Sequence, residues 1–122
     1  MAGVVSVVGP TDLISFHEQS IWPDLAATFL GCEACSDAQL AEASLMTYLG
    51  PDLPPAYWAY GADDSVVAPN PQGAVIASAW AEQTGPDSSW FDLIEGHGHN
   101  IPHWAINQRE LEKFVEFAVA RR

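Results

Sequence analysis

The chain has 122 residues, of which 48% are hydrophobic and 16% are charged. This length fits one globular domain, and the apolar fraction is too high for intrinsic disorder. Sixteen acidic residues against four basic ones give a formal net charge of −12. Such a charge repels phosphate backbones and anionic lipids, so it argues against nucleic acid or a membrane as a partner.

The chain opens on an apolar run at residues 4–8, which is closed by Gly9 and Pro10. A continuous β-branched run of this kind is typical of a strand in a parallel sheet that is covered on both faces. Residues 1–8 contain no basic residue and no small-residue cleavage site, so they do not predict a signal peptide. The sequence leaves the compartment open, and the lack of a signal-peptide pattern favours the cytoplasm.

Residues 11–50 form a mixed segment that we expect to be a lid-like helical insert. Within this segment, Ser36 followed by Gln39 is a capping-box pattern, which predicts a short helix through about Ser44.

Two cysteines, Cys32 and Cys35, lie just before that helix in a CxxC pattern. No predicted strand leads into them, as one would in a redox centre, and no second CxxC is present to complete a structural zinc site. A local loop disulfide and a pair of reduced thiols both remain open.

The rest of the chain alternates strands and helices. The predicted elements are a strand at residues 56–60, a helix from about 70 to 83, a strand at residues 89–94 and a helix that follows Asn107. Asn70 with Pro71, and Asn107 with Glu110, are helix-start patterns. This alternation predicts an α/β fold in which one domain, residues 1–122, contains a three-stranded parallel sheet with flanking helices.

The last predicted helix carries apolar residues at i, i+3, i+4, i+7 and i+8 spacing. These residues are Leu111, Phe114, Val115, Ala118 and Val119. The spacing predicts that this face packs on the sheet.

Polar residues occupy two loops that follow the second and third predicted strands. Asp63 and Asp64 follow the second strand, and His97 and His99 follow the third. In an open parallel sheet, ligands bind beyond the carboxyl ends of the strands. One alternative for this edge is a metal site, in which His97, His99 and His103 join Asp63 or Asp64, because imidazole and carboxylate groups bind Zn²⁺.

Several segments resemble the α/β-hydrolase family, in the branch of esterases related to prolyl oligopeptidases. Residues 54–67 resemble its acid loop with PPAYWAYGADDSVV, and residues 95–99 resemble its histidine loop with EGHGH. Residues 9–13, GPTDL, and residues 43–48, ASLMTY, resemble two further stretches of these enzymes. The resemblance covers nearly the whole chain but only the C-terminal half of such an enzyme, and it implies the fold of that half.

The resemblance also implies a catalytic pair. Asp64 stands at the position of the triad acid, three residues after Gly61, and His99 at the position of the triad base, directly after Gly98. A carboxylate held against one imidazole nitrogen fixes the tautomer and stabilises the imidazolium that forms during proton transfer. Two neighbouring loops at one sheet edge can bring the two side chains within hydrogen-bond reach. His97 matches no functional position of the family.

The nucleophile of these enzymes lies in a Gly-x-Ser-x-Gly elbow between a strand and a helix. None of the nine serines has flanking glycines at that spacing. The sequence therefore leaves open whether this chain is an enzyme, and we expect it to be nearly inactive alone. Ester or amide hydrolysis would need a partner chain that carries the nucleophile and the oxyanion donors. We expect no cofactor and no metal ion.

A second hypothesis makes the chain a non-catalytic remnant that serves as an assembly module. The first predicted strand has one free edge, and an open apolar edge tends to recruit another strand. We therefore expect a homodimer, or a partner chain bound along residues 4–8. A truncated reading frame without a selected function is a third alternative.

Overall fold

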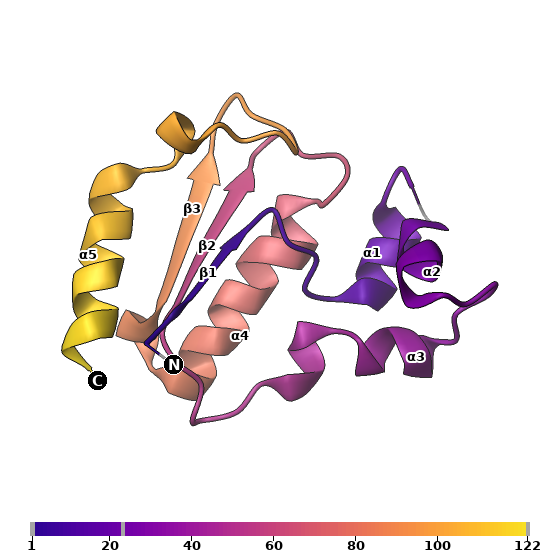
Figure 1. The fold of residues 1–122 in the computed structure, drawn as a ribbon, viewed down its shortest axis with the longest axis horizontal. Helices are drawn as coiled ribbons and strands as arrows, with labels where there is room; N and C mark the ends of the chain where they lie inside the picture. The colour runs from indigo at the N-terminus through magenta and orange to yellow at the C-terminus, as the bar shows by residue number, and fades with distance from the viewer. Residues whose placement is uncertain (1, 23, 122) are drawn as a thin grey trace.

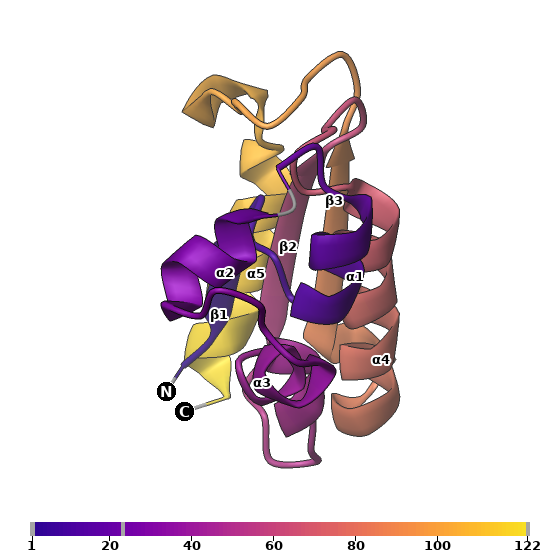
Figure 2. The same cartoon turned by 90° about the vertical axis from the view of Figure 1, so that its right-hand side faces the viewer.

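The structure is a computed structural model that describes residues 2–22 and 24–121. It contains a parallel sheet in the order β1-β2-β3, formed by β1 (Val4–Val7), β2 (Ala56–Gly61) and β3 (Ser89–Ile94). Helix α4 (Val75–Thr84) covers one face of the sheet, and helix α5 (Gln108–Ala120) covers part of the other (Figure 1, Figure 2). The predicted α/β fold with a three-stranded parallel sheet is confirmed.

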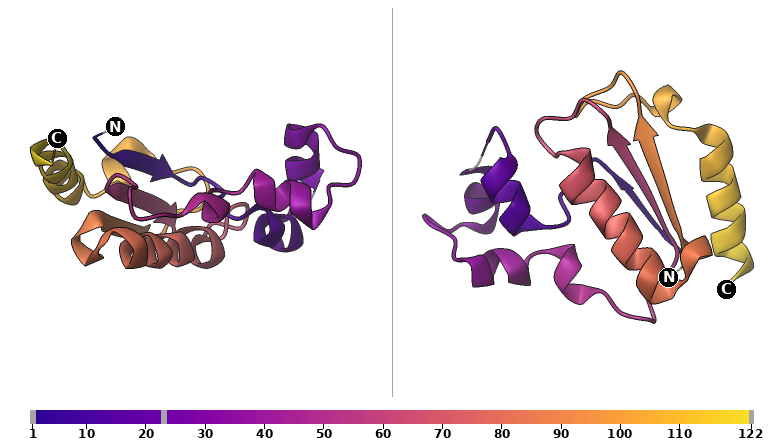
Figure 3. Two further views of the ribbon diagram at one scale, coloured as in Figure 1. Left: turned by 90° about the horizontal axis from the view of Figure 1, so that it is seen from below. Right: turned by 180° about the vertical axis from the view of Figure 1, so that it is seen from behind.

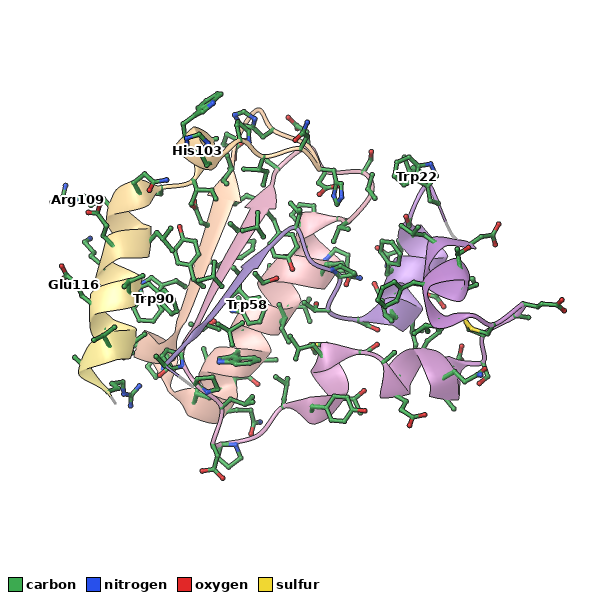
Figure 4. All side chains as sticks on the ribbon, in the orientation of Figure 1. Trp22, Trp58, Trp90, His103, Arg109 and Glu116 are labelled. Carbon is green, nitrogen blue, oxygen red and sulfur yellow. A yellow bond between two sulfur atoms is a disulfide. The ribbon has the colours of Figure 1, made fainter. Side chains whose placement is uncertain are left out.

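Aromatic side chains fill both faces of β2, whose six residues are all buried. On the α4 face, Trp58 packs edge-on against Trp80, with ring centroids 5.2 Å apart. The indole N–H of Trp58 donates to Ser89 Oγ at 3.0 Å, so its polar edge is satisfied despite its burial. On the α5 face, Trp90, which lies beside α5 in Figure 4, packs against a residue of that helix. This residue is Phe114, and the ring centroids are 5.3 Å apart. The central strand is thereby held from both sides.

The strand β1 differs from the sequence expectation, because only one of its faces is covered. Val5 is 52% exposed and Val7 is 39% exposed. Their register partners are Tyr57 and Ala59, which pack with α5, so both valines point to the α5 side of the sheet. Since α5 packs over β2 and β3, this face of β1 has no helix above it among the described residues.

The helix α5 begins as predicted, with Asn107 Oδ1 accepting a hydrogen bond from the Glu110 backbone N–H at 3.3 Å. Phe114 and Ala118 are buried against the sheet, as the spacing predicted. Val115 and Val119, on the same predicted face, are 48% and 51% exposed. The apolar stripe is therefore wider than the part of the sheet that it covers. Within the described residues, none of the helices is both long enough and apolar enough to cross a membrane.

The segment before β2 is mostly helical and projects beyond the edge of the sheet (Figure 3). It contains α1 (Leu13–Gln19), α2 (Asp24–Leu30), α3 (Asp37–Glu42) and a 3-10 turn at Leu45–Tyr48. The predicted capping box is present, with Ser36 Oγ accepting from Gln39 N at 3.3 Å and Gln39 Oε1 accepting from Ser36 N at 3.0 Å. A disulfide joins Cys32 and Cys35 between α2 and α3, which selects one of the two alternatives left open by the sequence.

The start of the helix near residue 70 corrects the sequence expectation that Asn70 is its cap. The first turn, Asn70–Ala74, is π-helical and continues into α4, and no side chain caps it. Gln72, which is 1% exposed, fixes this turn instead. Its Oε1 accepts from the backbone N–H groups of Thr11 and Asp12 at 2.8 and 2.9 Å, and its Nε2 donates to Asp12 O at 2.9 Å. Gln72 therefore ties the chain just before α1 to the start of α4.

We expect Gln72→Leu to lower the free energy of unfolding by about 2 kcal/mol, because it leaves the buried backbone N–H of Thr11 and the half-buried one of Asp12 without an acceptor. Urea unfolding followed by tryptophan fluorescence measures this change. Gln83→Leu is the matched control, since Gln83 lies exposed on α4 and should change stability by no more than about 0.5 kcal/mol. Equal stability of the two variants would show that the Gln72 contacts are not stabilising.

Tyr60 lies near the end of β2. Its side chain is buried, and its hydroxyl contacts Gly9 O at 2.5 Å and Gln72 O at 3.2 Å. Burial raises the pKa of Tyr60 from 10.0 to about 12, and the Asp64 carboxylate adds to this shift. Burial also raises the pKa of Tyr57, together with its hydrogen bond to Asp92.

These pKa shifts predict a loss of stability in alkali. Between the pKa of 10.0 and about 12, the unfolded chain releases the Tyr60 proton while the folded chain retains it, so rising pH favours unfolding. The contribution of Tyr60 to the free energy of unfolding is fully present below pH 10. Above that pH it falls by about 1.4 kcal/mol per pH unit. Urea unfolding at several pH values measures the slope, and Tyr60→Phe should reduce it while leaving the Tyr57 contribution. An unchanged slope in Tyr60→Phe would contradict the prediction.

Candidate active site

The loops that follow β2 and β3 touch through their backbones at the carboxyl edge of the sheet. The backbone N–H of Asp63 donates to His97 O at 3.0 Å. At Gly61, a Cβ atom would lie 2.2 Å from Gly98 O and 2.3 Å from His97 O. Only glycine leaves room for this contact. Gly61 therefore permits the close approach that brings the two loops together.

This approach places His99 Nδ1 3.0 Å from Asp64 Oδ2. The Asp64 side chain is completely buried, whereas the His99 side chain is 44% exposed. The other carboxylate oxygen, Oδ1, accepts hydrogen bonds from the backbone N–H groups of Val66 and Val67 at 2.8 and 2.9 Å. These two bonds fix the rotation of the carboxylate, so that Oδ2 is directed at the imidazole.

The hydrogen bond determines what His99 can do chemically. An ionised carboxylate can only accept, so the proton in this contact belongs to Nδ1 of His99. Nε2 of the neutral ring then has a lone pair, which can take a proton from a hydroxyl or thiol group. The buried Asp64 stabilises the imidazolium that this transfer creates. The geometry thus leaves Nε2 of His99 available to accept a proton, with Asp64 fixed against Nδ1.

His97 and Asp63, which the sequence also offered at this edge of the sheet, do not take part in the contact between Asp64 and His99. The His97 ring packs edge-on against Trp104, with centroids 5.6 Å apart, and Asp63 is exposed. Over residues 2–22 and 24–121, no group of three or more His, Cys, Asp or Glu side chains is arranged to hold a metal ion. The alternative of a zinc site built from His97, His99 and His103 therefore has no ligand set in this structure.

A cavity of about 510 Å³ adjoins His99. We call it the apolar cavity. It is lined by Val8, Pro10, Leu13, Phe16, Leu25, Ala26, Phe29, Ala43, Val66, Val67 and His99. Sequence reasoning did not find this cavity, because its walls come from the end of β1, from α1 and α2, and from the acid loop. The one available signal was the set of apolar residues within residues 11–50. The prediction of a lid-like helical insert already accounted for these residues.

Val8 is a second feature of the site that the sequence did not reveal. Its φ is +49°, a conformation that is rare for a β-branched residue, and no other described non-glycine residue has a positive φ. Its backbone N–H still donates to Ala59 O at 2.9 Å, so the turn comes directly at the end of the β1 ladder. Such strain costs about 1–3 kcal/mol and concentrates at functional sites. Here the strained residue lines the apolar cavity.

Comparison with known proteins shows a likeness of fold. No protein-family model matches the chain, and no curated protein matches it. Among solved structures, a protein of Bacteroides eggerthii described as a bifunctional GH43-CE, a glycoside hydrolase joined to a carbohydrate esterase, superposes with a TM-score of 0.67. The two chains are 23% identical, and the match covers 97% of this chain and 16% of that one. The likeness shows that this chain has the fold of a small part of a much longer protein.

Proposed function

We propose that this chain supplies the acid and the base, Asp64 and His99, of a serine-hydrolase triad in an assembly of the α/β-hydrolase type. The observation that carries the proposal is the 3.0 Å contact between His99 Nδ1 and a fully buried Asp64 carboxylate. The resemblance of residues 54–67 and 95–99 to the acid and histidine loops of that family supports it. The esterase label of the Bacteroides eggerthii protein supports an ester as the substrate.

In this proposal His99 Nε2 takes the proton of an attacking hydroxyl group and then delivers it to the leaving group, while Asp64 stabilises the imidazolium between the two steps. The nucleophile and the oxyanion donors come from another chain or another part of the assembly. A strand that joined the free edge of β1 in parallel would end beside Val8. Val8 and His99 line the same cavity, so that strand end is a suitable position for the nucleophile.

A chimera tests the proposal most directly. This chain would replace the matching 16% of the Bacteroides eggerthii protein, and hydrolysis of an activated aryl ester would be measured. We expect turnover that falls by at least about 10³-fold in His99→Ala, because the general base is lost. His97→Ala is the control and should leave turnover unchanged. A folded chimera that shows no turnover, or the same turnover with His99→Ala, would contradict the proposal.

The chain by itself should neither hydrolyse the ester nor react with a fluorophosphonate serine label, since no serine has the elbow spacing. Mass spectrometry after labelling tests this expectation. One labelled serine, together with turnover that depends on His99, would show that the chain carries its own nucleophile.

A second candidate function is assembly through β1, and the exposed valines favour it. Val5 and Val7 are exposed on the α5 side of the strand. Gly3 lies against α5, because a Cβ there would contact Phe114, and Val115 and Val119 are exposed on the same helix. A strand edge with exposed apolar side chains tends to recruit another strand. In this proposal two copies join along β1 into one continuous sheet.

Analytical ultracentrifugation over a range of protein concentrations tests the assembly. We expect a dimer that Val5→Lys converts into a monomer, because the lysine places a charge at the centre of the contact. Val75→Lys is the control, since Val75 is 45% exposed on α4, which covers the face of the sheet opposite to that of Val5. A wild-type chain that stays monomeric at all concentrations would contradict this candidate.

A further inference from the structure

We propose that the apolar cavity is a binding site for an uncharged apolar group of an ester, either an aliphatic chain or an aromatic ring. This inference rests on the proposed function, because it assigns a substrate class to the same site. The cavity has a volume of about 510 Å³, within the range of small-molecule sites in proteins.

The chemistry of the walls selects the ligand. Apart from His99, the side chains that line the cavity are all apolar. A charged group placed against these apolar side chains would lose its hydration and find no polar partner among them, which is strongly unfavourable. The net charge of −12 also repels anions, so a carboxylic acid product is expected to leave. The cavity is therefore expected to bind a neutral ester and not the carboxylic acid that hydrolysis of the ester produces.

Two residues in one wall connect the cavity to the candidate catalytic pair. Val66 and Val67 line the cavity, and their backbone N–H groups hold Asp64 Oδ1. Both valines are buried, at 8% and 2% exposure, so this wall is fixed. A group bound against Val66 and Val67 therefore lies in a constant relation to Asp64 and His99, with the attached ester group toward His99.

The residues of α2 that line the cavity are largely exposed. In α2, Leu25 is 45% exposed and Phe29 is 85% exposed, although both line the cavity. A bound apolar group would cover part of both side chains, and the removal of apolar surface from water is favourable. The rigid wall thus sets the position of the ligand, and the α2 wall contributes apolar contact.

Binding can be tested on the chain alone, because the proposed function predicts that the chain alone does not hydrolyse esters. Ethyl octanoate and octyl acetate would be titrated into the ¹⁵N-labelled chain, with octanoate as the charged comparison. We expect both esters to shift the amide signals of Val66, Val67 and Phe29, and octanoate to bind at least tenfold more weakly. The ester with the higher affinity identifies whether the acyl side or the alcohol side occupies the cavity.

Variants at exposed positions keep the fold intact while they alter the cavity. Ala43→Trp fills it from the rim and should lower ester affinity at least tenfold, and Phe29→Ser should lower it about fivefold. Trp104→Ser removes a different exposed aromatic side chain, one that does not line the cavity, and should change nothing. No ester binding up to the solubility limit, equal binding of octanoate, or signal shifts away from Val66 and Val67 would each overturn the inference.

Two measurements, ester binding by the chain alone and turnover by the chimera, separate this inference from the proposed function. If esters bind and the chimera is inactive, the binding site stands and the catalytic role of the pair fails. If His99→Ala abolishes turnover of the chimera and no ester binds to the chain, the catalytic role of the pair stands and the binding site fails.

Discussion

Replacing Asp64 with asparagine should leave the chain folded but reverse the tautomer of His99. Asparagine keeps a carbonyl oxygen for the backbone N–H groups of Val66 and Val67, which Asp64 Oδ1 accepts at 2.8 and 2.9 Å. Its amide then presents N–H to His99 Nδ1, where the carboxylate presented a lone pair. The proton of the ring moves to Nε2, which can no longer act as a base.

The effect on chemistry should be large even though the effect on stability is small. In the chimera, Asp64→Asn should lower kcat by about 10⁴-fold, the size of loss seen when a triad acid is replaced and the base adopts the wrong tautomer. Long-range ¹H–¹⁵N NMR spectra of the isolated chain report the tautomer directly. Asp63→Asn is the matched control, since Asp63 is exposed on the same loop. Identical His99 spectra in Asp64→Asn and the wild type would show that Asp64 does not orient the ring.

Gly61→Ala should be the most destabilising of the single substitutions considered, at about 3–4 kcal/mol. The new Cβ would lie 2.2 Å from Gly98 O and 2.3 Å from His97 O, and both of these atoms belong to backbone that cannot rotate away. Overpacking of this kind forces the backbone to shift. The histidine loop would then move off the acid loop, and the contact between His99 and Asp64 would lengthen.

Urea unfolding measures the stability of Gly61→Ala, and the NMR signals of His99 show whether the contact with Asp64 is kept. Gly50→Ala is the matched control, because a Cβ at Gly50 meets nothing within 4 Å. It should change stability by no more than about 0.5 kcal/mol. If both variants unfold at the same urea concentration, the close approach of the two loops does not require glycine.

Local patterns predicted the elements whose signals lie within a few neighbouring residues. The Ser36 capping box and the Asn107 cap were predicted and are present, since each needs only a side chain and a backbone N–H three residues away. The Asn70 cap was predicted on the same grounds and is wrong. There the long-range contacts of Gln72 with Thr11 and Asp12 determine how the helix begins.

The juxtaposition of Asp64 and His99 was also predicted from the sequence. Each residue follows a strand, the carboxyl ends of parallel strands meet at one sheet edge, and the resemblance to α/β-hydrolases marked these two positions. The hydrogen bond of 3.0 Å agrees with that prediction, whereas their catalytic role remains a proposal. The zinc-site alternative used the same loops, but the sequence could not show that the His97 ring turns to Trp104.

The sequence by itself determined the α/β order of the elements, the parallel sheet and the loops that carry the candidate pair, because periodicity, caps and strand ends are local properties. Only the tertiary structure decided which surfaces are covered. Val5 and Val7 have the sequence of buried strand residues, and they are exposed because α5 packs over β2 and β3. The apolar cavity arises in the same way. Its walls come from distant segments, and their distance in space depends on how the helices pack and not on any short stretch of sequence.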